Sequence, residues 1–252
     1  MARPLVAVGF MFFVFVGLFL PSAQADLIID IKPISAVGGA TIDLINNRVT
    51  VDSPGAVITL GIYANITGAD NDTTNEGLST FAGGILSTAA AGPVRGVVGT
   101  IGGVTLAADF AGTGSQIGSA NNLNSSGDLD WGGLSHTSAA GWIGGITRLL
   151  MSPIMNPPGV TTQLVGTFTY TVTEVNPGGS ATTLSWTRRN HSVPSANAQW
   201  TEDGQTKSAA KDSTNYRAGL SVELLAGGAG PTPANFVMTQ ASVTLPAVLI
   251  NA

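Results

Sequence analysis

The stretch Ala56-Val-Ile-Thr-Leu-Gly-Ile-Tyr-Ala-Asn-Ile66 decides the fold class. Every second residue from Ile58 to Ile66 is apolar, whereas the residues between them are small, polar or aromatic. Successive side chains of a strand point to opposite faces of its sheet, so this alternation predicts a strand with one fully buried face. A tight turn is expected immediately before it, at Asp52-Ser-Pro-Gly55. The chain is therefore expected to be built around a core strand over residues 56–66.

Shorter alternations of the same kind recur on both sides of this strand, separated by turn residues. Amphipathic helical patterns are almost absent. A chain of about ten short strands with almost no helix is typical of an all-β protein, and we predict an antiparallel two-sheet β-sandwich. The expected strands lie within residues 26–31, 41–51, 78–87, 94–106, 161–175, 182–188, 217–225 and 236–245.

Three of these segments carry finer expectations. Gly83-Gly84, inside the strand over 78–87, predicts a bulge or the close approach of another backbone. In 161–175, Leu164 begins an apolar series that alternates mainly with threonines, as in a sheet with one solvated face. The turn residues 176–179 then predict a hairpin with the strand over 182–188. The polar segment 192–211 is expected to be a loop.

The N-terminal segment has the features of a Sec-type signal peptide. Arg3 precedes an apolar run over residues 5–20, and the small residues Ala23 and Ala25 precede Asp26. The alternative is a retained membrane anchor, although the run is shorter than the ~20 residues that a spanning helix needs. We expect a protein that is secreted or held at the cell surface of a bacterium.

This division leaves one domain for the rest of the chain. Residues 1–25 are assigned to the signal peptide and residues 26–252 to a single β-sandwich domain. A Gly/Pro-rich connection over residues 226–235 precedes the last expected strand.

The composition excludes some classes of function. The formal net charge is -5, and removal of Arg3 with the signal peptide makes the remaining chain more acidic still. Because such a chain repels nucleic acid, we do not expect it to bind DNA or RNA. The sequence has no cysteine, which excludes disulfides and thiolate zinc sites.

A first candidate calcium loop occupies residues 122–133. Oxygen-bearing side chains alternate along it before and after Gly127, as in loops that wrap a hard cation. Position 12 of the loop is Gly133 rather than a bidentate glutamate, so we expect weak affinity for calcium. The alternative is a turn in which these side chains cap backbone amides. The candidate ligands are Asn122, Asn124, Ser126, Asp128 and Asp130.

A second candidate calcium loop follows the core strand. It carries Asp70, Asp72 and Glu76, which can hold calcium between two strands. The alternative is a solvated hairpin tip. Calcium is the one cofactor that the sequence suggests.

Residues for catalysis are scarce. The two histidines are His136 and His191, and the sequence has neither a Gly-x-Ser-x-Gly elbow nor a His-Glu-x-x-His motif. Carboxylate pairs of the kind that glycosidases use can be drawn from several acidic residues, but nothing selects one pair. We expect no enzymatic activity. The acidic candidates are Glu174, Glu202, Asp203 and Glu223.

Aromatic residues offer a second kind of binding site. Trp200 lies in a polar segment, so we expect it to be exposed and, with Tyr216, to stack on a sugar ring. Trp186 lies in an expected strand and is assigned to the core. The alternative for all of them is burial, since each ring covers a large apolar area.

Several motifs together resemble a known family, the cohesin-like secreted β-sandwiches of environmental bacteria, many of which end in a PEP-CTERM sorting tail. The resemblance covers approximately residues 50–190. It implies a jelly-roll sandwich, related to some carbohydrate-binding modules, that binds dockerin modules of other secreted proteins through one exposed sheet face. The motifs are Tyr63-Ala-Asn-Ile-Thr67, Asn75-Glu-Gly-Leu78, Phe81-Ala-Gly-Gly-Ile-Leu-Ser87, Phe110 with Gly114-Ser-Gln-Ile-Gly118, Gly127-Asp-Leu-Asp-Trp131 and Leu164-Val-Gly-Thr-Phe-Thr-Tyr170.

The sequence departs from this family in two places. Residues 243–252 show no Pro-Glu-Pro motif, spanning helix or basic cluster, so no sorting tail is visible. The acidic run that the family usually has near Gly127 is reduced here to Asn and Ser. Our first hypothesis is an exported protein that binds a dockerin-like protein partner. The alternatives are a carbohydrate-binding module or lectin, and a self-assembling structural protein of the cell surface.

Overall fold

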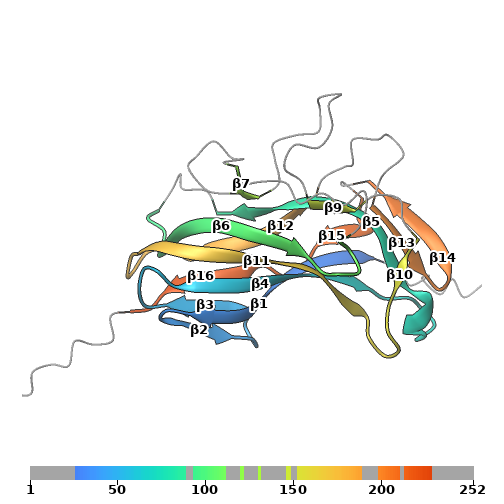
Figure 1. Cartoon of the computed structure of the whole chain (residues 1–252), viewed down its shortest axis with the longest axis horizontal. Helices are drawn as coiled ribbons and strands as arrows, with labels where there is room; N and C mark the ends of the chain where they lie inside the picture. Colours follow the sequence, from blue (N-terminus) through green and yellow to red (C-terminus); the bar gives the residue numbers. More distant parts are fainter. Residues whose placement is uncertain are drawn as a thin grey trace, which may run out of the picture.

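The computed structural model describes residues 26–88, 93–111, 120–121, 130–131, 146–148, 152–188, 198–210 and 213–228. Their regular structure consists of β-strands and one short 3-10 helix, η1 (Thr73–Asn75). The strands form two main sheets, one of five strands and one of eleven (Figure 1). This arrangement confirms the all-β class and is compatible with a β-sandwich. Within the described residues, no helix has the length and apolar character needed to cross a membrane.

The five-stranded sheet contains the strand from which the sequence analysis started. That strand, β4, lies at the centre of the order β15-β1-β4-β11-β6. Its even-numbered side chains from Ile58 to Ile66 are fully buried, as predicted. The members of this sheet are β1 (Leu27–Val37), β4 (Val57–Ile66), β6 (Val97–Leu106), β11 (Thr162–Val175) and β15 (Tyr216–Ala218).

The eleven-stranded sheet has the main order β14-β13-β5-β12-β16-β3-β2. Four very short strands join this sheet near β5. Its members are β2 (Ala40–Asp43), β3 (Arg48–Val51), β5 (Gly77–Ser87), β7 (Ala120–Asn121), β8 (Asp130–Trp131), β9 (Ile146–Arg148), β10 (Ile154–Met155), β12 (Thr182–Arg188), β13 (Ala198–Glu202), β14 (Gln205–Ala209) and β16 (Val222–Ala226).

The strand pairing differs from the prediction in two respects. Most pairs are antiparallel, but β15 pairs with β1 and β16 pairs with β3 in parallel. In each pair a strand near the C-terminal end of the described chain lies beside one near its beginning. Strands joined by a long connection can pair in parallel or antiparallel orientation. The turn over residues 176–179 forms, yet it does not make a hairpin, because β12 pairs with β5 and β16 rather than with β11. The turn carries the chain from one sheet to the other.

Two further strand predictions need correction. In β11 the pairing with β4 shifts between Leu164 and Gly166, so Val165 is buried and Leu164 is 39% exposed. The strand predicted over 217–225 is broken by residues 219–221 and contributes to both sheets as β15 and β16. In both cases the local pattern is right on average, but a bulge or a break changes which side chains face the core.

The core lies between the sheets and takes apolar side chains from both. Trp186 of β12 is buried, as expected, and its ring centroid lies 6.3 Å from that of Phe81. The Trp186 ring also lies against Gly83 of β5. The backbone carbonyl of Thr187 would lie 2.6 Å from a Cβ atom at Gly83, which confirms the close approach of another backbone that Gly83-Gly84 predicted. The residues assigned to the signal peptide and to the strand over 236–245 lie outside the described residues, as does most of the connection over 226–235.

Candidate metal centre

The loop between β4 and β5 is held in shape by its own side chains. Asp72 caps η1, and its Oδ1 accepts a hydrogen bond from Thr74 N at 3.0 Å. Asp70 Oδ1 accepts one from Asp72 N at 2.8 Å. Asn71 has a φ of 65°, a left-handed conformation that asparagine tolerates better than most residues. The loop therefore behaves as an Asx-rich turn, and in it the carboxylate of Asp72 serves the helix cap.

A hairpin from the far end of the sequence packs beside this loop. β13 pairs with β5 and with β14, and Asp203 and Gly204 form the turn between β13 and β14. Both turn residues have positive φ, 46° and 70°, as in the two-residue turns that suit antiparallel hairpins. Ala69 N donates to Asp203 Oδ1 at 3.0 Å, and Gly204 N donates to Asn75 O at 3.0 Å. These bonds join the hairpin tip to the loop.

The three carboxylates of Asp70, Glu76 and Asp203 meet at this junction. Each offers an oxygen that lies within 4.8 Å of the others. Asp70 is exposed, whereas Glu76 is only 2% exposed. A Cβ atom at Gly68 would collide with the carboxylate oxygens of Glu76 and Asp203, so a larger residue here would displace both carboxylates. We call these three residues the acidic cluster.

The acidic cluster is partly neutralised by hydrogen-bond donors. Gly68 N donates to Glu76 Oε1, and Asn156 Nδ2 donates to Glu76 Oε2 at 3.4 Å. Asn75 Nδ2 donates to Asp70 Oδ2 at 2.6 Å. No ion pair among the described residues joins a lysine or arginine to any member of the cluster. Within the described part of the chain, three carboxylates therefore share a small space without a basic partner.

Asn75 adds a further oxygen beside the acidic cluster. Its amide lies next to Asp70, and its Oδ1 is buried without a hydrogen-bond partner among the described residues. A buried acceptor without a donor costs free energy. Carboxylate and amide oxygens are the ligands that calcium prefers, usually six to eight in number with water included. The donor set of the cluster and Asn75 fits a hard divalent cation.

The pKa values of the carboxyl groups reflect this environment. Burial raises the pKa of Glu76, and the charges of Asp203 and Asp70 raise it further against the opposing hydrogen bonds from Gly68 and Asn156. Burial also raises the pKa of Glu202, which is 4% exposed and whose Oε2 has no hydrogen-bond partner among the described residues. Hydrogen bonds from Asp72 N and the Asn75 side chain lower the pKa of Asp70. When no cation is bound, ionisation of Glu76 is therefore unfavourable compared with that of a solvent-exposed glutamate.

The predicted calcium ligands have different outcomes. Asp70 and Glu76 belong to the acidic cluster, whereas Asp72 does not. Asn122, Asn124, Ser126 and Asp128 lie outside the described residues, and Asp130 is described only as part of the backbone of β8.

Asp203 was not predicted as a metal ligand. The sequence did contain a usable signal, because Asp-Gly between strands is a strong indication of a hairpin turn. The polar composition predicts a loop over residues 192–211, whereas the structure forms β13 and β14 there. Glu202 and Thr201 of β13 are polar and nevertheless buried.

The prediction that Trp200 is exposed is wrong. Trp200 is 1% exposed and Tyr216 is fully buried. Trp200 belongs to β13, which pairs with β5, and the Tyr216 hydroxyl accepts a hydrogen bond from Trp186 Nε1 at 3.1 Å. Both rings fill the core, so neither presents a face to a sugar in this structure.

The raised pKa values of Glu76 and Glu202 predict the pH dependence of stability without a cation. A folded-state pKa above the ordinary glutamate value of 4.5 contributes stability that is complete below pH 4.5 and is lost as the pH rises through the folded-state pKa. The lowered pKa of Asp70 acts in the opposite direction, but only below its ordinary value of 3.8. In chelator, the melting temperature is therefore expected to fall by a few degrees between pH 5 and pH 7, at about 2–4 °C per kcal/mol.

The variant Glu76→Gln supplies the control for this measurement. Glutamine keeps an acceptor for Gly68 N but does not ionise, so the variant is expected to show a shallower fall over the same pH range. A wild-type melting temperature that rises from pH 5 to pH 7, or a fall that Glu76→Gln leaves unchanged, would contradict the assignment.

Comparison of the chain with models of known protein families and with curated proteins gives no match.

Proposed function

We propose that the protein is a non-enzymatic β-sandwich module of the cell exterior, stabilised by a calcium ion at the acidic cluster. The observation that carries the proposal is the convergence of Asp70, Glu76 and Asp203 from two loops far apart in sequence, without a basic partner among the described residues. Oxygen-only ligands favour calcium or magnesium over softer metals. Calcium accepts irregular geometry more readily than magnesium, which suits a site built from two loops.

The cation joins two parts of the protein in this proposal. The β4–β5 loop and the β13–β14 hairpin approach each other through Asp203, which accepts hydrogen bonds from Ala69 N and Asp70 N. Figure 1 places η1 and the β13–β14 hairpin at the same end of the sheets. A cation held by carboxylates from both segments fixes their relative position, and with it this end of the sandwich.

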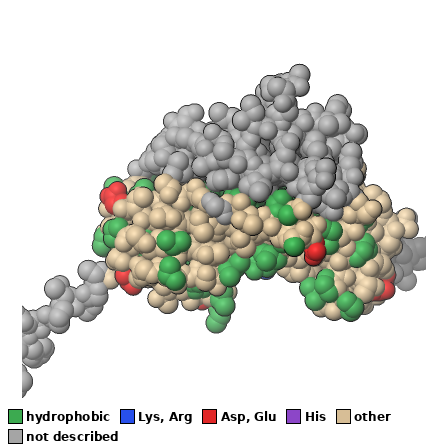
Figure 2. All heavy atoms as spheres, in the orientation of Figure 1, with side chains coloured by type: hydrophobic (Ala, Val, Ile, Leu, Met, Phe, Trp, Pro, Cys, Tyr) green, Lys and Arg blue, Asp and Glu red, His purple; other side chains and the backbone are tan. Residues whose placement is uncertain are grey.

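We further propose that the two sheets form a jelly-roll sandwich and that the protein binds a secreted or surface protein, in the manner of cohesins. The outer side of the five-stranded sheet supports this proposal because few of its described side chains are charged. Thr59 and Thr169 pair across β4 and β11, and Ile34, Val98 and Leu164 are exposed apolar side chains. Figure 2 shows hydrophobic side chains scattered among polar side chains, backbone and a few acidic side chains over the described part of the face in view. Low charge and exposed apolar groups suit the core of a protein interface.

Calorimetric titration of the chelator-treated protein with calcium tests the proposed metal centre. We expect one calcium ion per chain, with a Kd in the range of extracellular modules, about 10⁻⁴–10⁻³ M. Asp203→Asn removes one of three charges and is expected to weaken binding by at least about tenfold, equivalent to about 1.4 kcal/mol.

A matched variant in the other predicted calcium loop provides the control. Asp128→Asn makes the same chemical change within residues 122–133 and is expected to leave the Kd unchanged. Binding that survives Asp203→Asn but is lost in Asp128→Asn would contradict the proposed site and would assign the cation to the other loop.

A further inference from the structure

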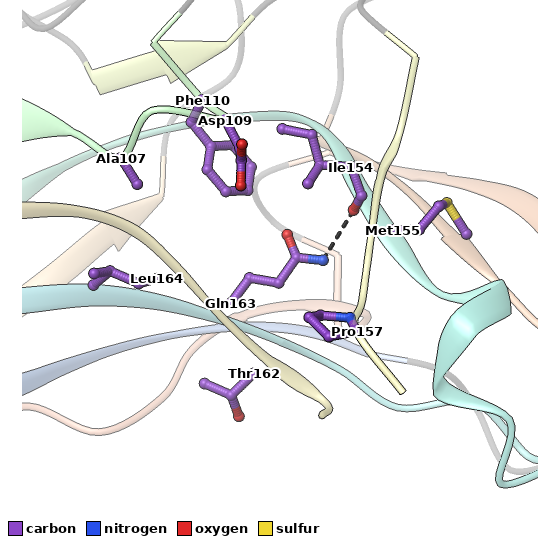
Figure 3. Close-up of a pocket in the computed structure, with 9 residues that line it drawn as sticks. All are labelled: Ala107, Asp109, Phe110, Ile154, Met155, Pro157, Thr162, Gln163 and Leu164. Atoms are coloured by element: carbon purple, nitrogen blue, oxygen red, sulfur yellow. Dashed lines mark hydrogen bonds between the residues drawn. The ribbon is translucent and has the colours of Figure 1, made fainter. Parts of the chain in front are cut away.

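A pocket of about 330 Å³ lies beside β10, between the segment that follows β6 and the beginning of β11 (Figure 3). Its volume is in the range of small-ligand sites. Gln163 of β11 and Asp109 contribute polar groups, and Phe110, Ile154 and Leu164 contribute apolar walls. The acidic cluster uses none of these residues.

Gln163 is held in one orientation by two hydrogen bonds. Its Nε2 donates to Ile154 O at 2.9 Å and to Asn156 Oδ1. Because a backbone carbonyl can only accept, the nitrogen of the amide must face Ile154. Gln163 is only 7% exposed, and its Oε1 atom is buried without a hydrogen-bond partner among the described residues. Figure 3 shows this oxygen directed towards the side of the pocket where Asp109 lies.

The polar side chains of the pocket offer acceptors and no free donor. Both N–H groups of the Gln163 amide are already used. Thr162 donates its hydroxyl proton to Asn65 Oδ1, which leaves only lone pairs for a ligand. The carboxylate of Asp109 is exposed at the rim and adds a negative charge. A ligand with several donors and a positive charge complements this set.

The apolar walls limit the shape of that ligand. Phe110 is buried, so its ring offers no open face for a sugar to stack on. Ile154 and Leu164 supply aliphatic surface between the buried amide oxygen and the solvent. Lysine side chains bury their methylene stems along such surfaces and keep the charged end at polar groups. An ammonium group has three N–H donors, which suit Gln163 Oε1 and the carboxylate of Asp109. Thr162 precedes Gln163 in β11 and points to the other face of the strand, so it borders the pocket without sharing this ligand.

We propose that this pocket binds a primary ammonium group at the end of a short aliphatic chain. The chemistry is that of a lysine side chain of a partner protein or of a free alkylamine. The ammonium donates to Gln163 Oε1, for which the described residues supply no donor, and lies beside the carboxylate of Asp109. The aliphatic stem covers Ile154 and Leu164. The pocket uses no member of the acidic cluster, but Asn156 bonds both to Gln163 and to Glu76, so the proposal is tested both in calcium and in chelator.

An NMR titration of the ¹⁵N-labelled protein tests the proposal with defined probes. Nα-acetyl-lysine methylamide and n-butylamine are expected to give saturable shifts. Nα-acetyl-norleucine methylamide, which keeps the stem but lacks the ammonium, and a methyl glucoside are expected to give none. Tighter binding of the capped lysine than of n-butylamine identifies a protein side chain as the natural source, and the reverse order identifies a free amine.

Two variants connect the binding to the pocket. Asp109→Asn changes an exposed residue, so the fold is retained, and both amines are expected to bind at least about tenfold more weakly because a charge-assisted hydrogen bond is lost. Glu174→Gln removes a carboxylate from the exposed surface of the same chain, near the other end of β11, and is expected to leave both Kd values unchanged. Equal binding of the norleucine compound, absence of saturation with either amine, or an unchanged Kd in Asp109→Asn would overturn the proposal.

Discussion

Gly83→Ala is expected to lower the free energy of unfolding by about 3 kcal/mol or more, because a methyl group at this position has no space. The new Cβ would overlap the ring of Trp186 and would lie 2.6 Å from the carbonyl oxygen of Thr187. Overpacking of a well-packed core typically costs about 1–3 kcal/mol and more when backbone atoms are involved. Thr187 pairs directly with Gly84, so the carbonyl cannot move without breaking the contact between β5 and β12. Urea unfolding followed by tryptophan fluorescence measures the loss.

Gly102→Ala provides the matched substitution in the other sheet. The nearest atom that its Cβ would meet is Thr169 Oγ1 at 3.8 Å, an ordinary van der Waals contact. This variant is expected to be within about 0.5 kcal/mol of the wild type, since it adds a methyl group without strain and reduces the freedom of the unfolded chain. Equal stability of the two variants would show that β5 and β12 do not approach as closely as described.

Gly83 shows how far local sequence patterns reach in this protein. The paired glycines inside an otherwise regular strand indicated a close neighbour, and the alternation over 56–66 indicated a buried face; both predictions are confirmed. These features depend on the residues of a single strand. The identity of the neighbour, Trp186, depends on which strands pair, and that choice is made by burial over the whole sheet.

The failed hairpin after β11 illustrates the same limit. Residues 176–179 have the composition of a turn and form one, with Gly178 at a φ of 84°. Turn chemistry determines that the chain reverses, but not whether the two flanking strands pair with each other. Here β12 buries Leu184 and Trp186 in the core by joining β5 and β16. Such pairing between distant segments is not written in the local sequence.

The candidate metal centre was predictable only in part for a related reason. Asp70 and Glu76 lie in one loop, and their spacing was sufficient to propose them. Asp203 lies 133 residues after Asp70 in the sequence and reaches the loop through a hairpin whose buried strand β13 contains Thr201 and Glu202. Polar residues in a buried strand conceal the periodicity on which strand prediction depends. The same misinterpretation led to the wrong prediction for Trp200, which belongs to that strand.

Calcium is expected to raise the melting temperature of the wild-type protein by about 5–10 °C at a concentration of 100 Kd. A ligand that binds only the folded state at this concentration contributes about 2.7 kcal/mol, and each kcal/mol corresponds to about 2–4 °C for a chain of this size. The physical origin is the acidic cluster, because the buried carboxylate of Glu76 gains a positive partner in place of the repulsion from Asp70 and Asp203. Thermal melts in chelator and in calcium measure the effect.

Asp203→Asn is expected to reverse the order of stability between these two conditions. Asparagine tolerates the φ of 46° at this position and keeps an acceptor for Ala69 N, so the hairpin tip is preserved. In chelator the variant loses one repulsive charge and is expected to melt at or above the wild-type temperature. In calcium the variant lacks a ligand and is expected to melt below the wild-type protein.

Asp72→Asn makes the same change in the β4–β5 loop, outside the cluster, and asparagine retains the cap on η1. It is expected to keep the full calcium response, so only a cation held by Asp203 gives opposite signs in the two melts. A wild-type melting temperature that is the same in chelator and in calcium would remove the metal from the account of this cluster and leave its stabilisation to hydrogen-bond donors such as Gly68 N, Ala69 N and the side chain of Asn75.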